Sequence, residues 1–98
     1  MKLPSIGEFE ELVLLTVAAQ HDQAYGVSIK VQLEETLGKK VNISAVHVAL
    51  KRMTDKGFVD AKFGGITQTR GGRRKKYYHI TLYGKKVLDN QYEIRTNL

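Results

Sequence analysis

The chain has no cysteine, no tryptophan and a single proline among its 98 residues. The lack of cysteine excludes disulfides, a thiolate nucleophile and cysteine-based metal sites. With only three phenylalanines and five tyrosines, the core must be largely aliphatic. The longest largely apolar run, residues 12–19, is far too short to cross a bilayer, and the N-terminus lacks the pattern of a signal peptide. We therefore expect a cytoplasmic protein that has no membrane partner.

Patterns that support catalysis or cofactor binding are equally scarce. The three histidines are scattered and lack the spacing of metal ligands. The Gly-Gly pairs at 64–65 and 71–72 match neither a P-loop nor a dinucleotide fingerprint. Adjacent carboxylates such as Glu10 and Glu11 diverge on a helix and make a poor acid–base pair. We expect that the protein is not an enzyme and needs no metal or cofactor.

Positive charge is in excess and unevenly distributed. The net charge is +6, with a pI of about 9.7. Most acidic residues lie in the first 40 positions, whereas five of the seven residues from 70 to 76 are cationic. A localised basic patch is the electrostatic footprint of a phosphate-binding protein. A solvated surface that only maintains solubility is the alternative explanation.

The basic cluster is flanked by two runs with β propensity, residues 58–63 and 77–82. Gly71 and Gly72 can adopt positive φ and so permit a tight turn between them. The pattern predicts a β-hairpin with a cationic tip, and Gly64-Gly65 predicts a bend or bulge in its first strand.

Apolar periodicity predicts three helices before the hairpin, at about 8–20, 25–37 and 44–56, and a weaker one over 82–98. Gly38 is expected to stop the second helix and Ser44 to cap the third. A brief strand could occupy 39–43. The first helix is apolar nearly all round, which indicates burial on more than one side, against its own domain and against a second subunit.

The third helix is the candidate recognition helix. Val46, Leu50 and Met53 share one face and should hold it to the core. The opposite face carries small, polar and basic residues suited to a DNA groove, namely Ser44, Ala45, His47, Val48, Lys51 and Arg52. The hairpin, or wing, at about 58–81 adds cations for the phosphate backbone, namely Arg70, Arg73, Arg74, Lys75 and Lys76.

The predicted fold class is therefore α+β and mostly helical, a winged helix-turn-helix of three helices and a β-hairpin. Four segments together resemble the PadR family of transcriptional regulators, namely 7–15, 24–29, 50–53 with 56–59, and 72–81. The resemblance implies a sequence-specific DNA-binding homodimer, usually a repressor, that binds a palindromic operator. It implies a DNA-binding domain over 1–81 and a dimerisation helix over 82–98. His47 stands where the family usually has tyrosine, so base preference should differ.

In the family the C-terminal helix makes most dimer contacts and the N-terminal helix assists. We therefore expect the apolar residues of these two helices at a dimer interface, namely Phe9, Leu14, Leu15, Val87, Leu88, Tyr92 and Ile94. Some members respond to small hydrophobic or phenolic effectors, which makes such a compound a further candidate partner. The short C-terminal helix argues against a large effector pocket, and the lack of tryptophan argues against the aromatic drug-stacking site of some members.

Two other kinds of binding protein remain as alternatives. The hairpin could dock an acidic protein, in which case nucleic-acid binding would be weak and non-specific. An RNA-binding protein would need exposed aromatics for stacking, and only Tyr77 or Tyr78 could serve. The small residues ahead of the basic ones on the third helix favour entry into a DNA groove.

Overall fold

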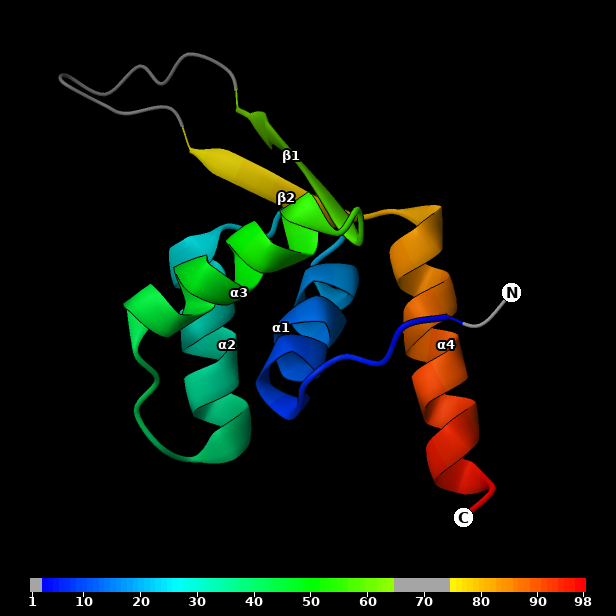
Figure 1. The fold of residues 1–98 in the computed structure, drawn as a ribbon. Coiled ribbons are helices and arrows are strands. Elements are labelled where there is room, and N and C mark those ends of the chain that lie inside the picture. Colours follow the sequence, from blue (N-terminus) through cyan, green and yellow to red (C-terminus); the bar gives the residue numbers. More distant parts are fainter. Residues whose placement is uncertain (1–2, 65–74) are drawn as a thin grey trace, which may run out of the picture.

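The structure is a computed structural model that describes residues 3–64 and 75–98. Its helices and strands, in chain order, are α1 (Glu8–Ala19), α2 (Gly26–Leu37), α3 (Ile43–Asp55), β1 (Val59–Phe63), β2 (Lys76–Ile80) and α4 (Leu82–Thr96) (Figure 1). This mostly helical α+β arrangement confirms the predicted fold class. The predicted hairpin tip, with Gly71-Gly72, Arg70, Arg73 and Arg74, lies outside the described residues.

Local signals explain where the helices begin and end. Glutamates at the start of α1 favour the positive end of the helix dipole. Gly38 ends α2 with a φ of 69°, as its sequence position predicts. The predicted cap of α3 is wrong by two residues, because the Asn42 side chain accepts the Ser44 N–H at 2.7 Å. Ser44 is thus inside the first turn. Residues 39–42 form no strand and connect α2 to α3.

The two strands pair antiparallel, from Val59 opposite Ile80 to Phe63 opposite Lys76. The second strand ends earlier than predicted because Thr81 caps α4, its Oγ1 accepting the Gly84 N–H at 2.9 Å. The Tyr78 N–H donates to the Ala24 carbonyl at 2.8 Å, which ties the hairpin to the segment ahead of α2. The base of the hairpin is therefore fixed to the helical core.

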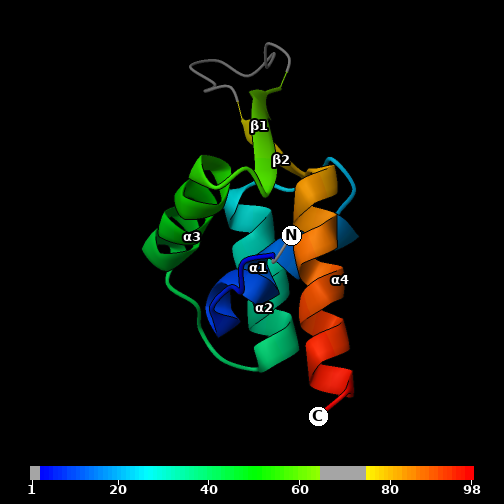
Figure 2. The same ribbon diagram turned by 45° about the vertical axis from the view of Figure 1, so that its right-hand side comes forward.

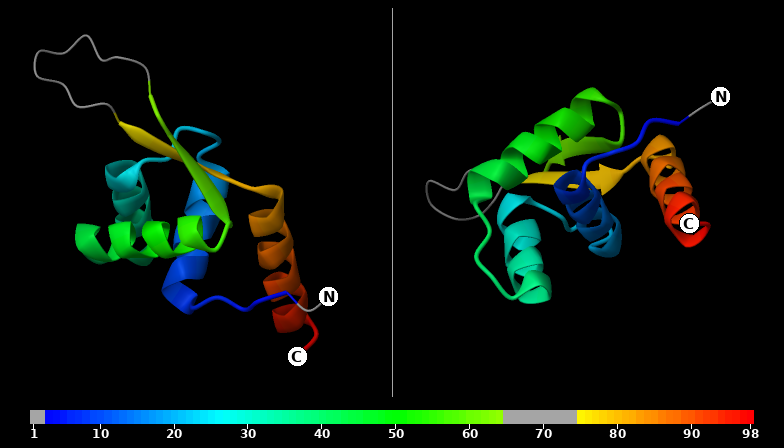
Figure 3. Two further views of the ribbon diagram at one scale, coloured as in Figure 1. Left: turned by 45° about the horizontal axis from the view of Figure 1, so that its top comes forward. Right: turned by 60° about the horizontal axis from the view of Figure 1, so that its bottom comes forward.

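The core lies between α1, α2 and α3 and is mostly aliphatic, as the composition predicts. Val46, Leu50 and Met53 are fully buried, so α3 packs on the core by the predicted face. Phe58, at the start of the hairpin, is 1% exposed and its ring lies 5.5 Å from that of Tyr83. Figure 3 shows α3 crossing α1 and α2, with its outer side free of the other described elements.

Helix α4 packs beside α1, on the opposite side of the bundle from α3 (Figure 2). Glu11 is its main polar anchor, since its carboxylate accepts hydrogen bonds from Arg95 at 2.7 Å and from Gln91 at 3.2 Å. Gln91 also donates to the carbonyl of Ile6 at 3.2 Å. Within residues 3–64 and 75–98, no helix is long and apolar enough to cross a membrane.

Glu34 braces the loop that leads into α3. Its carboxylate accepts the Val41 N–H at 2.9 Å and lies 3.2 Å from the Lys30 ammonium. These two contacts, the Val41 hydrogen bond first, hold the pKa of Glu34 below its usual value of 4.5. A lowered pKa means that the folded state favours the ionised carboxylate. The resulting stability is present above the unfolded pKa and is lost as pH falls through the folded pKa.

We therefore expect Glu34→Gln to unfold at a lower temperature than wild type at pH 7, and the difference to shrink as pH falls through the lowered pKa of Glu34 in the folded state. Thermal unfolding at pH 7 and pH 3, followed by circular dichroism, measures both differences. Glu35→Gln, which removes an exposed carboxylate from the same helix, is the matched control. A difference that stays constant with pH would contradict this role.

Candidate nucleic-acid interface

The outer face of α3 presents every residue predicted to contact a groove. All six are exposed, and they run from the N-terminal turn towards the C-terminal end of the helix in the order Ser44, Ala45, His47, Val48, Lys51 and Arg52. Val48 is half exposed, at 50%, and leaves an apolar spot among polar neighbours. A helix with small residues at its N-terminal end and cations further along can approach base edges and phosphates together.

His47 does not extend freely from α3 but lies over the first turn of α2. A Cβ at Gly26 would be 2.6 Å from His47 Cε1 and 3.1 Å from Nε2, so the ring occupies space that only glycine leaves open. Gly26 itself is buried. Sequence reasoning did not connect the two residues, because they are 21 positions apart and belong to different helices. The absence of a side chain at Gly26 thus makes room for this orientation of His47, a predicted base-contacting residue.

We expect Gly26→Ala to displace the imidazole of His47 and so change which operator variants are bound. The loss of stability should be about 1 kcal/mol, the low end of overpacking costs, since the side chain can rotate away. Binding to a library of operator variants, with urea unfolding in parallel, measures both effects. His47→Ala should shift the preference at the same base positions, and a preference identical to wild type in Gly26→Ala would contradict the assignment.

The base of the wing forms an aromatic and cationic cluster with the residue that precedes α2. Lys75 Nζ lies 4.3 Å from the centre of the Tyr25 ring, and the Tyr25 and Tyr77 rings meet edge to face at 5.8 Å. Cation–π attraction of this kind holds a side chain in place without neutralising it. Lys75 and Lys76 are both exposed, as a phosphate contact requires. Sequence reasoning missed Tyr25, which lacks any local signal for this contact.

Tyr78 belongs to the core and not to the interface. It is 8% exposed, and burial raises the pKa of its hydroxyl. Tyr77 on the opposite face of the strand is half-buried against Tyr25. The two tyrosines therefore lie on opposite faces of β2, Tyr78 towards the core and Tyr77 towards Tyr25.

The cations of α3 are already close to carboxylates. Lys51 pairs with Asp55 at 3.3 Å, four residues along the helix. Arg52 Nη1 lies 3.9 Å from a carboxylate oxygen of Glu10 on α1, and Lys56 Nζ lies 3.6 Å from the other oxygen. The basic surface of α3 is thus partly compensated, which the sequence does not reveal because Glu10 is distant from it along the chain.

The residues predicted at a dimer interface divide into two groups. Leu14 and Val87 are fully buried in the core of the protomer, so the expectation that they face a second subunit is corrected. Both are held inside by the packing of α1 and α4 on the core. The remaining five keep exposed or half-buried surface, namely Phe9, Leu15, Leu88, Tyr92 and Ile94.

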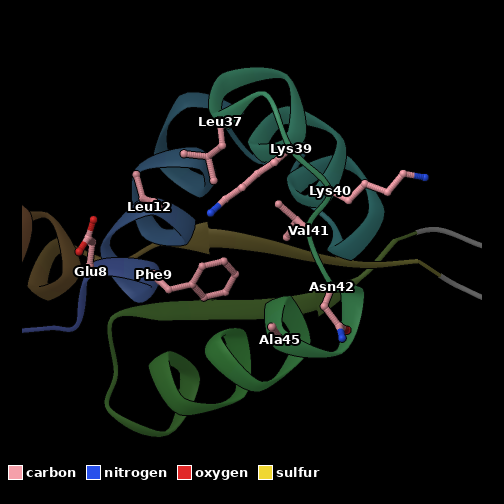
Figure 4. Close-up of a pocket in the computed structure, with 9 residues that line it drawn as sticks. All are labelled: Glu8, Phe9, Leu12, Leu37, Lys39, Lys40, Val41, Asn42 and Ala45. Atoms are coloured by element: carbon pink, nitrogen blue, oxygen red, sulfur yellow. The ribbon is translucent and has the colours of Figure 1, made fainter.

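A pocket of about 400 Å³ lies beside the N-terminus of α3, between the start of α1 and the end of α2 (Figure 4). Phe9, Leu12 and Leu37 give it an apolar wall. Lys39 points into it, whereas Lys40 points away. The pocket also touches Asn42 and Ala45, the cap and the first turn of α3. Among the described residues, no group of side chains could hold a metal ion.

Comparison with known proteins places this geometry in context. The sequence model of the transcriptional regulator PadR-like family matches residues 14–90. A PadR family transcription regulator from hypervirulent Clostridium difficile R20291 is 27% identical, with a TM-score of 0.72 over 89% of this chain and 85% of that chain. No curated protein matches the chain significantly.

Two further solved structures have the same fold. Bacillus subtilis PadR in complex with operator DNA is 26% identical, with a TM-score of 0.72 over 86% of this chain and 46% of that chain. RosR of H. salinarum is 22% identical, with a TM-score of 0.73 over 94% and 76% of the two chains. The described hairpin and helices are thus those of a winged-helix regulator, which is a DNA-binding and not an enzymatic protein. The family match spans most of the sequence, and the chain belongs to the PadR-like family of transcriptional regulators.

Proposed function

We propose that this regulator is a sequence-specific repressor that binds a palindromic operator as a homodimer. The observation that carries the proposal is the outer face of α3, where six predicted contact residues are all exposed while the opposite face is fully buried. A recognition helix needs this division, because one face must fix its position while the other reads the groove. The operator complex of B. subtilis PadR, at 26% identity, supports DNA as the ligand.

Each part of the surface has its own role in the proposal. Ser44, Ala45, His47 and Val48 face base edges in the major groove, where the methyl groups of Ala45 and Val48 suit the thymine methyl. Lys51 and Arg52 contact the backbone, as do the cations of the wing, Arg70, Arg73, Arg74, Lys75 and Lys76. Backbone contacts position the protein, and base contacts specify the sequence.

The dimer in this proposal is built by residues 82–98, with help from α1. Helix α4 leaves Tyr92 and Ile94 exposed by 69% and 50%, and α1 leaves Leu15 exposed by 46%. Apolar side chains that are this exposed in the protomer are expected to form the buried core of an interface. Two recognition helices would then meet half-sites about one helical turn apart, roughly 34–36 Å.

A small hydrophobic or phenolic effector belongs to the proposal as a second partner. The pocket at the start of α3 supports it, since a compound bound there would touch Asn42 and Ala45 and so influence the recognition helix. A thermal-shift panel of phenolic acids and uncharged aromatics, followed by DNA binding at saturating compound, tests this. A compound that stabilises the protein and weakens operator binding is expected, and an inert panel would remove the effector from the proposal.

The central experiment is fluorescence-anisotropy binding to a duplex from the region upstream of the gene and to a randomised pool, over a salt series. Saturable preference for the upstream duplex, with two subunits per site, is expected. If about four phosphates are neutralised per subunit, the slope of log K against log salt should be roughly −7. Weak binding that is equal on both duplexes and vanishes with salt would favour the alternative, a winged-helix protein-interaction module.

A further inference from the structure

One carboxylate on α1 faces two cations of the recognition helix. Glu10 has a side chain that is only 13% exposed, and its two oxygens lie 3.9 Å from Arg52 and 3.6 Å from Lys56. The side chains of Arg52 and Lys56 are 66% and 50% exposed. Arg52 is in the last turn of α3 and Lys56 is the residue that caps its C-terminal end, so the two cations are four positions apart and lie on the same side. Glu10 is thus a largely buried negative charge beside two exposed positive ones.

The position of Glu10 explains why the charge stays in place. It lies in the first turn of α1, where the helix dipole favours a carboxylate. Both contacts exceed hydrogen-bond length and involve exposed cations, so each is a weak ion pair that a phosphate can outcompete. A carboxylate at this position therefore competes with a phosphate for the same two cations.

Resting on the proposed function, we propose that Glu10 is a positioning residue that restrains Arg52 and Lys56 and thereby limits non-specific DNA binding. Backbone neutralisation supplies nearly all non-specific affinity, so a carboxylate that competes for two cations acts directly on it. A regulator searches among a large excess of wrong sites, and weaker retention on them leaves more protein for the operator. Glu11, the adjacent residue, does not share this role because it bonds to α4.

Glu10→Gln tests the proposal against Glu8→Gln, which makes the same charge change one half-turn away. Glu8 is exposed, and it takes part in no ion pair within residues 3–64 and 75–98. On a randomised duplex we expect E10Q to bind about two- to fivefold more tightly than E8Q, the range set by exposed ion pairs. Its slope of log K against log salt should steepen by about one, because one more phosphate contact forms.

A double-mutant cycle with Arg52→Gln separates positioning from a general structural role. Loss of Arg52 should weaken non-specific binding more in the E10Q background than in wild type, because only there is the guanidinium unrestrained. Urea unfolding of each variant shows whether folding has changed. The decisive measurement is the slope of log K against log salt, because a residue with a merely structural role would not change the number of phosphate contacts.

Equal affinities and slopes for E10Q and E8Q would overturn the proposal and leave only an effect of net charge. Weaker binding of E10Q on operator and random duplex alike, together with lower stability, would also overturn it and assign Glu10 to helix packing. Neither result touches the proposed function, which fails only if wild-type protein shows no preference for the upstream duplex.

Discussion

Replacing Gly84 with alanine is expected to lower the free energy of unfolding by about 2–3 kcal/mol, as overpacking of a close contact does. A Cβ at this position would lie 2.2 Å from the carbonyl oxygen of Phe58 and 2.9 Å from Ile80 Cγ1. The first of these atoms belongs to the backbone and cannot rotate away. Helix propensity alone predicts the opposite, a gain of about 1 kcal/mol, because alanine is a better helix former than glycine.

Urea unfolding followed by circular dichroism, at one fixed protein concentration, decides between these expectations. Gly7→Ala is the matched control, because nothing lies within 4 Å of its Cβ position and its φ of −68° suits alanine. The control should cost less than about 1 kcal/mol. A Gly84→Ala protein as stable as wild type would mean that α4 does not pack so closely on Phe58.

Val48→Glu is expected to weaken operator binding by at least about 100-fold, since a like charge held against phosphates costs several kcal/mol. Val48 is half exposed at the centre of the proposed groove-facing surface. Glutamate fits a helix at least as well as valine, so folding should not suffer. Anisotropy with the operator duplex measures the loss, and an unfolding curve within about 0.5 kcal/mol of wild type excludes misfolding.

Gln32→Glu adds the same charge at an exposed position of α2 and should change operator affinity only slightly. If both variants bind the operator like wild type, α3 does not enter the groove by this face. If both lose binding equally, net charge rather than the position of Val48 controls affinity. The contrast between the two substitutions is thus specific to the docking geometry.

Much of the fold could be predicted because local signals and the global packing agree. The four-residue spacing of Val46 and Leu50 predicted the buried face of α3, and Gly38 predicted the end of α2. The basic cluster and its two β-prone flanks predicted the hairpin, and its strands pair as expected at the described positions. These features depend on neighbours within one turn of helix or one strand pair, which a sequence displays directly.

Features that depend on contacts between distant segments could not be predicted. The support of His47 by Gly26, and the pairing of Glu10 with Arg52, join positions with no shared local pattern. Leu14 and Val87 were assigned to a dimer interface because an apolar stripe does not say which of two partners covers it. A glycine in the first turn of a helix weakens that helix in isolation, whereas the close packing of Gly84 on Phe58 requires a glycine there.

Thr81 joins the hairpin to α4 without any intervening linker. Its hydroxyl donates to the Gly57 carbonyl at 2.7 Å and accepts the Gly84 N–H, and Ile80 immediately before it still belongs to β2. In the proposed dimer, the DNA-binding domains of the two subunits are therefore held at a fixed separation and angle. Each base pair inserted between half-sites moves them about 3.4 Å apart and turns them by roughly a tenth of a revolution. Such a protein should tolerate almost no change in the spacing between half-sites. The spacer length then contributes to operator specificity along with the base sequence.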